Sequence, residues 1–250
     1  MPDTYLSIYE RFPEFLKRRI NPLEYALRCF VRQAAEAHPG EVVLDAGAGQ
    51  SRFKPFFTAH RYLAVDLGLG DAGWDYSGID LCADLGRLPV RSDSVDAVLN
   101  TQVLEHVPDP QRVLSEFHRV LRPGGKLYLT APQGWHEHQQ PRDFFRFTSF
   151  SLRMMLEKAG FEEIRIDPMG GYFHYLGQRF TYIPKILFQQ RRGLGRLLLA
   201  PFELLSLGAC CFALPIACYY LDRLDRKKEF TLLYRCLAAK NGRNQEAEGG

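Results

Sequence analysis

The chain has 250 residues, with 32 basic and 29 acidic side chains and a formal net charge of +3. This length suits one α/β domain with an elaboration, and so small a dispersed charge excludes an extended basic surface for nucleic acid. Six cysteines without a C-x-x-C pair predict reduced apolar side chains instead of disulfides or zinc ligands. The first residues lack a basic region followed by an apolar run, so we expect a cytoplasmic protein.

The first half of the chain alternates helical and strand patterns. A helix is expected from Asn21, which is an N-cap followed by proline, to residue 40. Strands are expected at 41–45, 62–66, 79–82 and 95–100, with a helix at 53–59. These strands are rich in Val, Leu and Ala, which is typical of parallel strands buried on both faces.

The second half continues the alternation. Helices are expected at 109–121, capped by Asp109, and at 148–160, and strands at 126–131 and 161–167. A last strand at 230–240 is expected antiparallel beside 161–167. The fold class is therefore α/β, with a doubly wound, mostly parallel seven-stranded sheet, and ligands bind such sheets beyond the carboxyl ends of the strands.

The stretch "VVLDAGAGQSRF" (42–53) indicates a nucleotide-like ligand. Gly47 and Gly49 let the backbone approach a ligand closely, and Asp66 ends the next strand, where a carboxylate can bind a ribose. A dinucleotide is disfavoured because Arg52 replaces the third glycine and Asp45 would repel phosphates. A cofactor with a ribose, a cationic amino group and no phosphate fits better.

Several motifs in this order resemble the class I S-adenosylmethionine-dependent methyltransferases, specifically the methyltransferase type 11 group. They are "VLDAGAG", "YLAVDL" and the stretch "CADLGRLPVRSDSVDAVLNTQVLEHVPDPQRVLSEFHRVLRPGGKLYLTAP", within about residues 40 to 165. The resemblance implies a Rossmann-like transferase fold, methyltransferase activity and S-adenosyl-L-methionine as cofactor. Ser51 departs from it, because many members have a third glycine there.

The resemblance also implies the cofactor-binding residues. Asp45, Gly47 and Gly49 would frame the methionine moiety, and Asp66 would bind the ribose. The adenine and the wall beside the sulfonium would involve Asp84, Leu85, Asn100 and Gln102. Two alternatives remain for single members: Asp84 as the cap of a turn, and Asn100 as a strand-end hydrogen-bonding residue.

The segment "PQGWHEHQQPRDFFRFTSFSL" (132–152) resembles an acceptor-side element of some family members. We expect His136, His138 and Asp143 as catalytic candidates, and Trp135 and Arg146 as substrate-binding ones. Asp143 and Arg146 could instead form an ion pair on a helical turn, and Glu105 and His106 read as helix-start polar groups. No metal is predicted, although His136, His138 and Asp143 leave a metal site as an alternative.

The segment 204–221 has 18 consecutive residues without a charge, but it precedes a strand of the same sheet, so one complete membrane crossing is excluded. We expect a helical hairpin, kinked near Pro201 and Pro215. Basic residues that suit anionic headgroups flank it on both sides, namely Arg191, Arg192, Arg196, Arg223, Arg226, Lys227 and Lys228. Three alternatives stay open for 194–228: a membrane surface, a buried cap or a dimer interface. The predicted organisation is a helical segment 1–40, a methyltransferase core 41–169, a hydrophobic insertion 170–229, the strand 230–240 and a disordered tail 241–250.

The predicted function is methyl transfer to a small-molecule, lipid or glycan-precursor acceptor. One alternative is a non-catalytic cofactor-binding or membrane-scaffold protein with the same fold, and another is an NAD-linked enzyme. The identity of the acceptor, the need for a general base and the oligomeric state do not follow from the sequence.

Overall fold

The computed structural model describes residues 12–37, 40–71, 73–188 and 194–242, with side chains except at 194–198. The chain divides into two compact units. The sheet unit comprises Cys29–Asp167 and Leu233–Gly250, and the hairpin unit comprises Met1–Arg28 and Pro168–Leu232.

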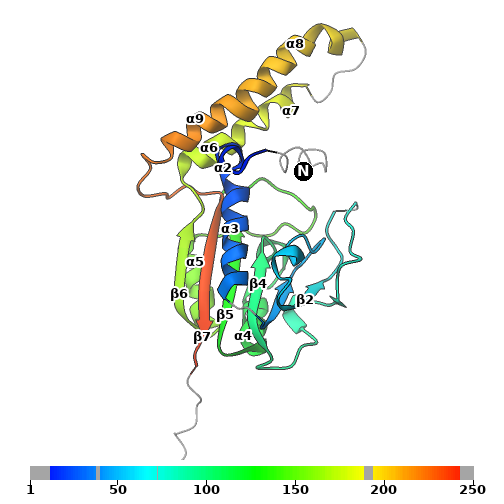
Figure 1. Cartoon of the computed structure of the whole chain (residues 1–250), viewed down its shortest axis with the longest axis vertical. Helices are drawn as coiled ribbons and strands as arrows, with labels where there is room; N and C mark the ends of the chain where they lie inside the picture. Colours follow the sequence, from blue (N-terminus) through cyan, green and yellow to red (C-terminus); the bar gives the residue numbers. More distant parts are fainter. Residues whose placement is uncertain (1–11, 38–39, 72, 189–193, 243–250) are drawn as a thin grey trace, which may run out of the picture. The chain divides into compact units, whose positions relative to one another are not determined.

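The sheet unit is built on one seven-stranded sheet with the order β3-β2-β1-β4-β5-β7-β6 (Figure 1). The strands are β1 (Val42–Ala46), β2 (Arg61–Asp66), β3 (Leu81–Cys82), β4 (Val95–Thr101), β5 (Leu121–Pro132), β6 (Phe161–Pro168) and β7 (Leu233–Lys240). Pairing is parallel between β3 and β2, β2 and β1, β1 and β4, and β4 and β5. The strand β7 pairs antiparallel with β5. The doubly wound, mostly parallel sheet predicted from the sequence is confirmed.

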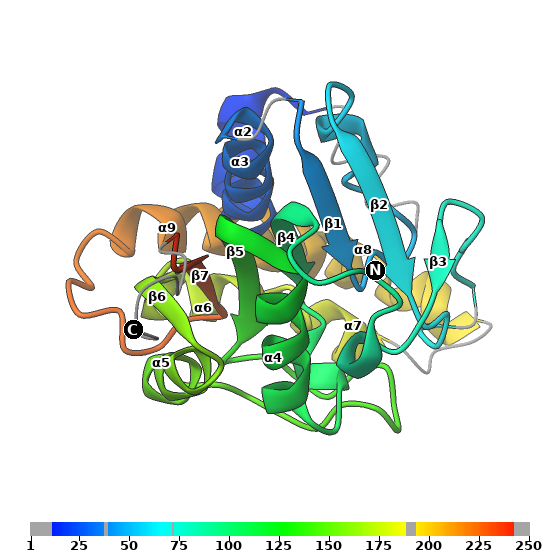
Figure 2. The same ribbon diagram turned by 90° about the horizontal axis from the view of Figure 1, so that it is seen from below.

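Helices cover both faces of this sheet, as Figure 2 shows for α3 (Pro22–Ala37) on one side and α4 (Pro110–Val120) and α5 (Ser149–Lys158) on the other. Asp109 caps α4 as the sequence predicts, because its side chain accepts a hydrogen bond from the first turn, and Thr148 caps α5 at the expected start of that helix. On the opposite face the Phe30 ring of α3 lies 5.6 Å from that of Tyr128 on β5. Apolar burial on both faces fixes the sheet and holds the strand ends in place.

The expected helix at 53–59 is wrong. The described chain forms one 3-10 turn there, η1 (Lys54–Phe56), and leaves the helical region at Phe57, with φ −109° and ψ 34°. This departure lets the buried Phe57 ring pack against Tyr62, at a centroid distance of 5.4 Å. The glycine-containing loop after β1 therefore runs into a short turn and not into the N-terminus of an α-helix.

The hairpin unit consists of helices. After α2 (Glu14–Ile20), the chain forms α6 (Tyr172–Phe180) and α7 (Ile183–Phe188), and it returns through α8 (Leu194–Gly208), the π-helical turn η4 (Ala209–Ala213) and α9 (Leu214–Leu221). Figure 1 shows the returning leg beside α6 and α7. Pro201 lies within α8 and Pro215 in the first turn of α9, and Leu199–Leu221 still runs as one helix. The hairpin expected within 194–228 is therefore wrong, because this segment forms only the returning leg and α6 with α7 forms the other. Arg191 and Arg192 of the predicted basic flank, and most of the predicted tail, lie outside the described residues.

One buried carboxylate ties the two legs of the hairpin together. Asp222, directly after α9 and 4% exposed, accepts hydrogen bonds from the backbone amides of Gly171 and His174, each at 3.0 Å. These amides belong to the first turn of α6, whose positive dipole end favours a negative charge. The end of the returning leg therefore caps the start of the outgoing leg.

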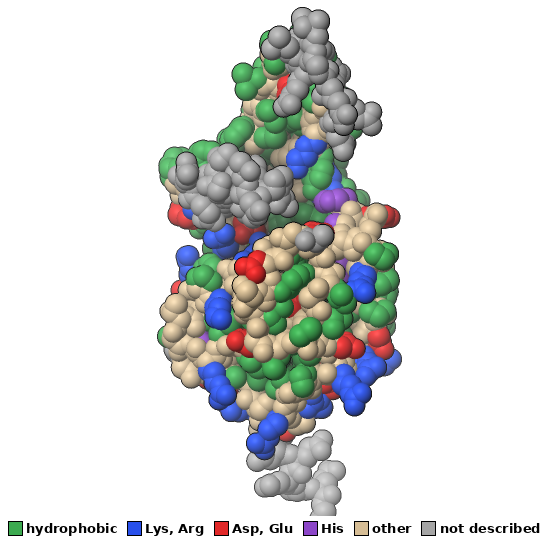
Figure 3. Space-filling view, turned by 90° about the vertical axis from the view of Figure 1, so that its right-hand side faces the viewer, with side chains coloured by type: hydrophobic (Ala, Val, Ile, Leu, Met, Phe, Trp, Pro, Cys, Tyr) green, Lys and Arg blue, Asp and Glu red, His purple; other side chains and the backbone are tan. Residues whose placement is uncertain are grey.

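The returning leg is long and apolar but little buried. Leu199–Leu221 is one helix of 23 residues, and its most apolar stretch has a mean hydropathy of 1.9 and is 11% buried. Leu204 and Leu205 are 73% and 71% exposed, and Figure 3 shows hydrophobic side chains on the surface of this part of the chain. A helix in the core of a soluble protein of this composition would be mostly buried.

Candidate functional site

Two buried polar side chains lie on the neighbouring strands β1 and β4, where the strand order reverses. Asp45 of β1 is 1% exposed and Asn100 of β4 is fully buried. The Asn100 side-chain amide donates to the Ala46 carbonyl at 2.7 Å, which ties the two strand ends together. This is the position at which open α/β sheets bind their ligands.

Only one oxygen of the Asp45 carboxylate accepts a hydrogen bond within the described part of the chain. Its Oδ2 accepts a hydrogen bond from the Tyr62 hydroxyl, while Oδ1 is buried and has no hydrogen-bond partner within the described part of the chain. Burial raises the pKa of Asp45 to about 7, and the Tyr62 hydrogen bond opposes that rise. An unpaired buried oxygen of this kind suits a cationic ligand group.

The loop after β1 brings bare backbone to this position. Gly47 has φ +85°, and a Cβ atom there would lie 2.4 Å from a methyl carbon of Val103. Gly49 has φ +52° and packs against Trp74. Both residues use the left-handed conformation that favours glycine, and Gly47 also has no room for a side chain.

Ser51 uses the same conformation, with φ +53°. Its hydroxyl donates to the Gly78 carbonyl at 3.1 Å, and the residue is 8% exposed. The third glycine of many family members thus corresponds to a position where serine is tolerated through a local hydrogen bond.

Asp66, the predicted ribose ligand, ends β2 and organises two loops. Its Oδ2 accepts from the Gly49 amide at 2.8 Å and its Oδ1 from the Gly68 amide at 2.7 Å. The carboxylate therefore joins the glycine loop to the chain after β2. Each oxygen keeps a second lone pair for a hydroxyl donor.

The remaining predicted cofactor residues lie in two short turns. Asp84 caps the 3-10 turn η2 (Leu85–Arg87) through the Gly86 amide at 2.8 Å, as the alternative to a binding role supposes, and Leu85 is buried. Gln102 has φ +55° just after β4, and its backbone amide donates to the Thr130 carbonyl at 3.1 Å. Their roles as cofactor ligands stay predictions.

An ion pair orders the predicted acceptor loop. Arg146 donates to both oxygens of Asp143 at 2.7 Å and to the carbonyls of Trp135 and His136 at 3.1 and 2.8 Å. This pair holds the pKa of Asp143 well below its usual range. The two residues lie in an irregular segment and not on a helical turn. A carboxylate held in this way positions the loop better than it accepts protons.

The other loop candidates differ in exposure. His136 is exposed and stacks on Trp135 at a centroid distance of 5.6 Å, while His138 is half-buried. The His138 amide donates to Asp143 Oδ2 at 2.8 Å. The structure thus brings Asp143, Arg146 and His138 together and leaves His136 at the surface.

Sequence reasoning missed the residues that face His138. His106 belongs to the 3-10 turn η3 (Leu104–His106), and its Nε2 lies 3.1 Å from Nε2 of His138. The neighbouring Glu105 is 1% exposed, and burial raises the pKa of this residue to about 8. Burial also lowers the pKa of His106. The motif "LEH" stands 32 residues before His138, and no local pattern joins the two.

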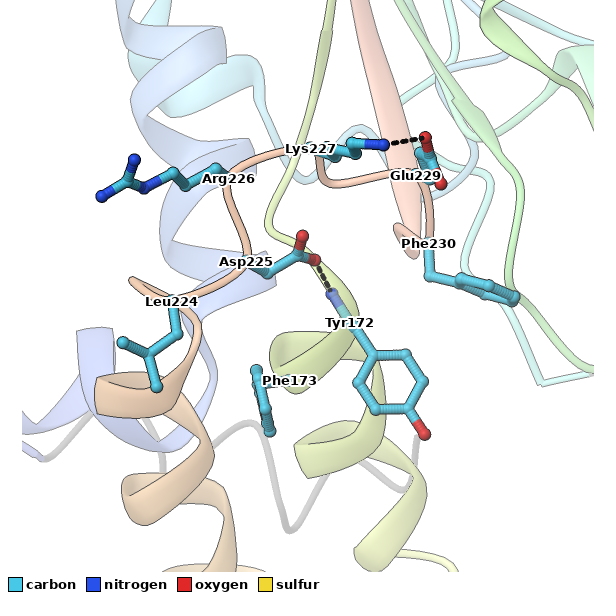
Figure 4. Close-up of a pocket in the computed structure, with 8 residues that line it drawn as sticks. All are labelled: Tyr172, Phe173, Leu224, Asp225, Arg226, Lys227, Glu229 and Phe230. Carbon is cyan, nitrogen blue, oxygen red and sulfur yellow. Dashed lines mark hydrogen bonds and ion pairs between the residues drawn. The ribbon is translucent and has the colours of Figure 1, made fainter.

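The hairpin unit has a groove of its own, about 500 Å³ in volume, at the junction of α6 with the chain after α9 (Figure 4). It is lined by Tyr172, Phe173, Leu224, Asp225, Arg226, Lys227, Glu229 and Phe230. The Asp225 carboxylate accepts from the Tyr172 amide at 2.7 Å. The groove combines aromatic and aliphatic walls with cationic side chains, and none of its lining residues is among the predicted catalytic, cofactor-binding or substrate-binding residues.

Residues 44–129 match the family model described as "Methyltransferase domain". An arsenite methyltransferase of Halobacterium salinarum is 31% identical over 155 residues, which are 52% of this chain and 39% of that protein. A probable S-adenosylmethionine-dependent methyltransferase of Mycolicibacterium smegmatis is 31% identical over 150 residues, which are 55% of this chain and 57% of that protein. The chain therefore spans about half the length of these relatives or less.

The fold also matches solved structures. The [4+2]-cyclase SpnF shares it with a TM-score of 0.56 and 18% sequence identity, over 86% of this chain and 81% of that one. The name of that protein describes a cyclisation, so the fold by itself does not fix the reaction. The reaction has to be argued from the residues at the strand ends.

Proposed function

We propose that the chain transfers a methyl group from S-adenosylmethionine to a small-molecule, lipid or glycan-precursor acceptor, which the match of residues 44–129 to the methyltransferase model and the similarity to methyltransferase relatives support. The observation that carries this proposal is the buried Asp45 oxygen without a partner among the described residues, at the switch point of the sheet. A cationic amino group is the ligand group that this oxygen suits, and a phosphate is not.

The residues at the strand ends fit S-adenosylmethionine. Asp45 would bind the amino group, Gly47 and Gly49 leave backbone room beside it, and Asp66 has lone pairs for ribose hydroxyls. When bound, this cofactor supplies a methyl group on a positively charged sulfur. The buried Asn100 keeps an oxygen without a hydrogen-bond partner within the described chain, on the strand next to Asp45.

The protein contributes mainly alignment and exclusion of water. Methyl transfer is an in-line displacement, and well-oriented reactants lower the barrier by roughly 7 to 11 kcal/mol. A base is needed when the acceptor is a hydroxyl or a protonated amine. His136 and His138 are then the candidates, since Asp143 already accepts both guanidinium hydrogen bonds of Arg146.

Titration calorimetry of the full chain with S-adenosylmethionine, and in parallel with NAD, tests the cofactor. Binding of the first and not of the second is expected, and no binding of S-adenosylmethionine at millimolar concentration rejects the function. Labelled methyl transfer to extracts, with and without added lipid, then identifies the acceptor class.

We further propose that the hairpin unit lies on a membrane surface, where a lipid or lipid-linked acceptor is at hand. The long apolar leg, with 11% of its most apolar stretch buried, supports this over a buried cap. Because the chain enters and leaves the hairpin at neighbouring strands of one sheet, the hairpin dips into the interface and does not carry the sheet across.

The base of the hairpin has the side chains of a membrane interface. Arg19 of α2 donates to the Tyr220 hydroxyl at 2.7 Å, and Arg18 lies 5.9 Å from the centre of the Tyr219 ring. Arg226 and Lys227 line the groove nearby on the same unit. Tyrosine rings and cationic side chains next to an apolar helix suit the headgroup region of an anionic bilayer.

Flotation with vesicles of phosphatidylglycerol and phosphatidylcholine tests this placement. The protein is expected to float, and Leu204→Glu with Leu205→Glu should leave it at the bottom of the gradient. Phe150→Glu is the matched control, since Phe150 of α5 is an 82% exposed apolar residue outside the hairpin unit. A wild-type protein that stays at the bottom, or a dimer that the two leucine changes dissociate, contradicts the membrane proposal.

A further inference from the structure

Two histidine rings in the sheet unit face each other through the same kind of nitrogen. Nε2 of His106 and Nε2 of His138 are 3.1 Å apart, and the ring centroids are 4.6 Å apart at 78°. Which nitrogen carries the proton on each ring is fixed by what surrounds the other nitrogen.

On both rings the other nitrogen faces acceptors. His106 Nδ1 lies 2.6 Å from the Arg142 carbonyl, which can only accept, so this nitrogen donates. His138 Nδ1 lies 3.1 Å from the His136 carbonyl and 3.2 Å from Asp143 Oδ2. Asp143 forms an ion pair with Arg146, so its carboxylate is an acceptor. Both neutral rings therefore present a lone pair at Nε2, and two lone pairs at this distance repel unless a cation lies between them.

A buried carboxylate completes the group. Glu105 Oε1 lies 3.9 Å from His106 Nε2, and Oε2 is buried without a hydrogen-bond partner in the described residues. One ligand atom from each of Glu105, His106 and His138 lies within 4.8 Å of the others. A carboxylate that is 1% exposed and has an unsatisfied oxygen is costly unless a donor or a cation reaches it.

We propose that Glu105, His106 and His138 bind a divalent transition-metal ion, with Zn²⁺ as the best fit. Zinc bonds to imidazole nitrogens of about 2.0–2.1 Å, at angles from a right angle to the tetrahedral value, hold two nitrogens about 2.9–3.4 Å apart. The observed spacing of the rings lies in that range. Two imidazoles and one carboxylate are a donor set for Zn²⁺ or Fe²⁺ and leave at least one position for water or an acceptor group.

The surroundings support each ligand. The hydrogen bonds from both Nδ1 atoms orient the imidazoles in the way that carbonyl and carboxylate partners orient metal-bound histidines. Arg146 is the nearby cation, and the Asp143 carboxylate compensates its charge. The sequence alternative of His136, His138 and Asp143 gives way to a different set, in which Asp143 acts on the histidine and not on the ion.

The site adjoins the glycine loop. Val103, the N-cap of η3, closes against Gly47, and Glu105 and His106 follow within the same turn. An ion there would connect the loop around His138 to the turn beside the predicted cofactor position. With an ion bound, both nitrogens of His138 are occupied, and of the two base candidates only His136 remains. The metal proposal does not depend on methyl transfer, because metal binding is measured without cofactor or acceptor.

Calorimetric titration of the chelator-treated full chain with ZnCl₂ tests the site. Cys29 and Cys82 are exposed and are first replaced by serine, since free thiols also bind zinc. One equivalent is expected to bind, and His138→Ala, His106→Ala and Glu105→Gln should each weaken binding by at least about tenfold, because even outer partners are worth 10–100-fold. His136→Ala is the matched control in the same loop and should stay within about twofold.

Glu105→Gln separates metal binding from a structural role. The change keeps the shape of the side chain, so the metal-free melting temperature should change little, while the increase that Zn²⁺ causes in the wild type should disappear. The proposal is overturned if the wild type does not bind zinc at submillimolar concentration. It is also overturned if the Glu105→Gln and His138→Ala variants bind zinc as tightly as the wild type. The two rings would then share a proton.

Discussion

The hydroxyl of Tyr62 on β2 donates to Asp45 on the adjacent β1, and the two side chains share the buried interior of the sheet unit. This contact leaves Asp45 with one satisfied oxygen and one unsatisfied one. The pKa of Asp45 rises to about 7 because burial outweighs the hydrogen bond. The protonation state of Asp45 should therefore affect both the stability of the ligand-free protein and its affinity for the cofactor.

Cofactor affinity should rise with pH between about 5.5 and 7. The cationic amino group binds the ionised form of Asp45, and an α-amino group with a pKa near 7.7 stays charged throughout this range. With the pKa of Asp45 at about 7, the apparent dissociation constant is expected to fall about tenfold over the range. Calorimetry at several pH values checks this, and Asp45→Asn should bind weakly with no such slope.

The free energy of unfolding of the ligand-free protein should change in the opposite sense. The folded-state pKa of Asp45 lies above the usual 3.8, so the native state holds an extra proton between about pH 4 and 7. This contribution is fully present at low pH and is lost as pH rises through 7, by up to about 4 kcal/mol. Urea denaturation of wild type and Asp45→Asn at pH 6 and 8 samples the last part of this loss, about 1.4 kcal/mol. An equal pH dependence in both proteins would contradict the assignment.

Asp66→Ala should weaken binding of the cofactor by roughly 1 to 3 kcal/mol, because charge-assisted hydrogen bonds to the ribose are lost. Asp80→Ala is the control. Asp80 likewise accepts a backbone amide, that of Ala64 at 2.8 Å, but it is outside the predicted site. Unchanged affinity in the first variant, measured by calorimetry, would show that Asp66 only orders the loops of Gly49 and Gly68.

Gly47→Ala should destabilise the fold by about 3 kcal/mol. The left-handed conformation costs an alanine about 1 kcal/mol and the clash with Val103 adds more. Gly68→Ala separates the two effects, since Gly68 has φ +71° and a Cβ atom there would meet nothing within 4 Å. Chemical denaturation should therefore show a clearly smaller loss for Gly68→Ala. Equal losses would mean that conformation alone requires glycine at 47.

Arg146→Lys should loosen the acceptor loop and destabilise the fold by about 1 to 3 kcal/mol. Lysine cannot form the two parallel bonds to Asp143 while it also reaches two carbonyls. Arg153→Lys, at an exposed ion pair of 3.9 Å to Glu157, should change stability by less than about 0.5 kcal/mol. Hydrogen exchange of residues 135–143 provides the local readout, and unchanged protection there would contradict the role of Arg146.

The sequence predicted best what depends on neighbours along the chain. Asp109 and Thr148 are caps because their side chains reach amides three residues away, which a short motif encodes. The helix at 53–59 failed because tertiary contacts of Phe57 outweighed a helical pattern. The pairing of His106 with His138 was missed for a similar reason, since 32 residues separate them and only the fold brings them together.

The start of the last strand shows the same limit. It was expected at residue 230, and the structure begins β7 at Leu233, because where pairing with β5 starts is decided by the sheet and not by local composition. The glycines and acidic residues at the strand ends were found because their types and spacing carry the chemistry. How Asp45 and Asp66 divide their oxygens among partners required coordinates.

The strand β7 lies between β5 and β6, yet it follows the whole hairpin in the sequence. During synthesis β5 and β6 therefore leave the ribosome before the strand that lies between them. The strand β7 can take this position only after the apolar helices of the hairpin have emerged. The apolar surface of the hairpin is thus exposed before the sheet is complete. A bilayer that binds the hairpin at that stage would cover its apolar surface while the sheet is incomplete, and would thus assist folding as well as provide the site of the reaction.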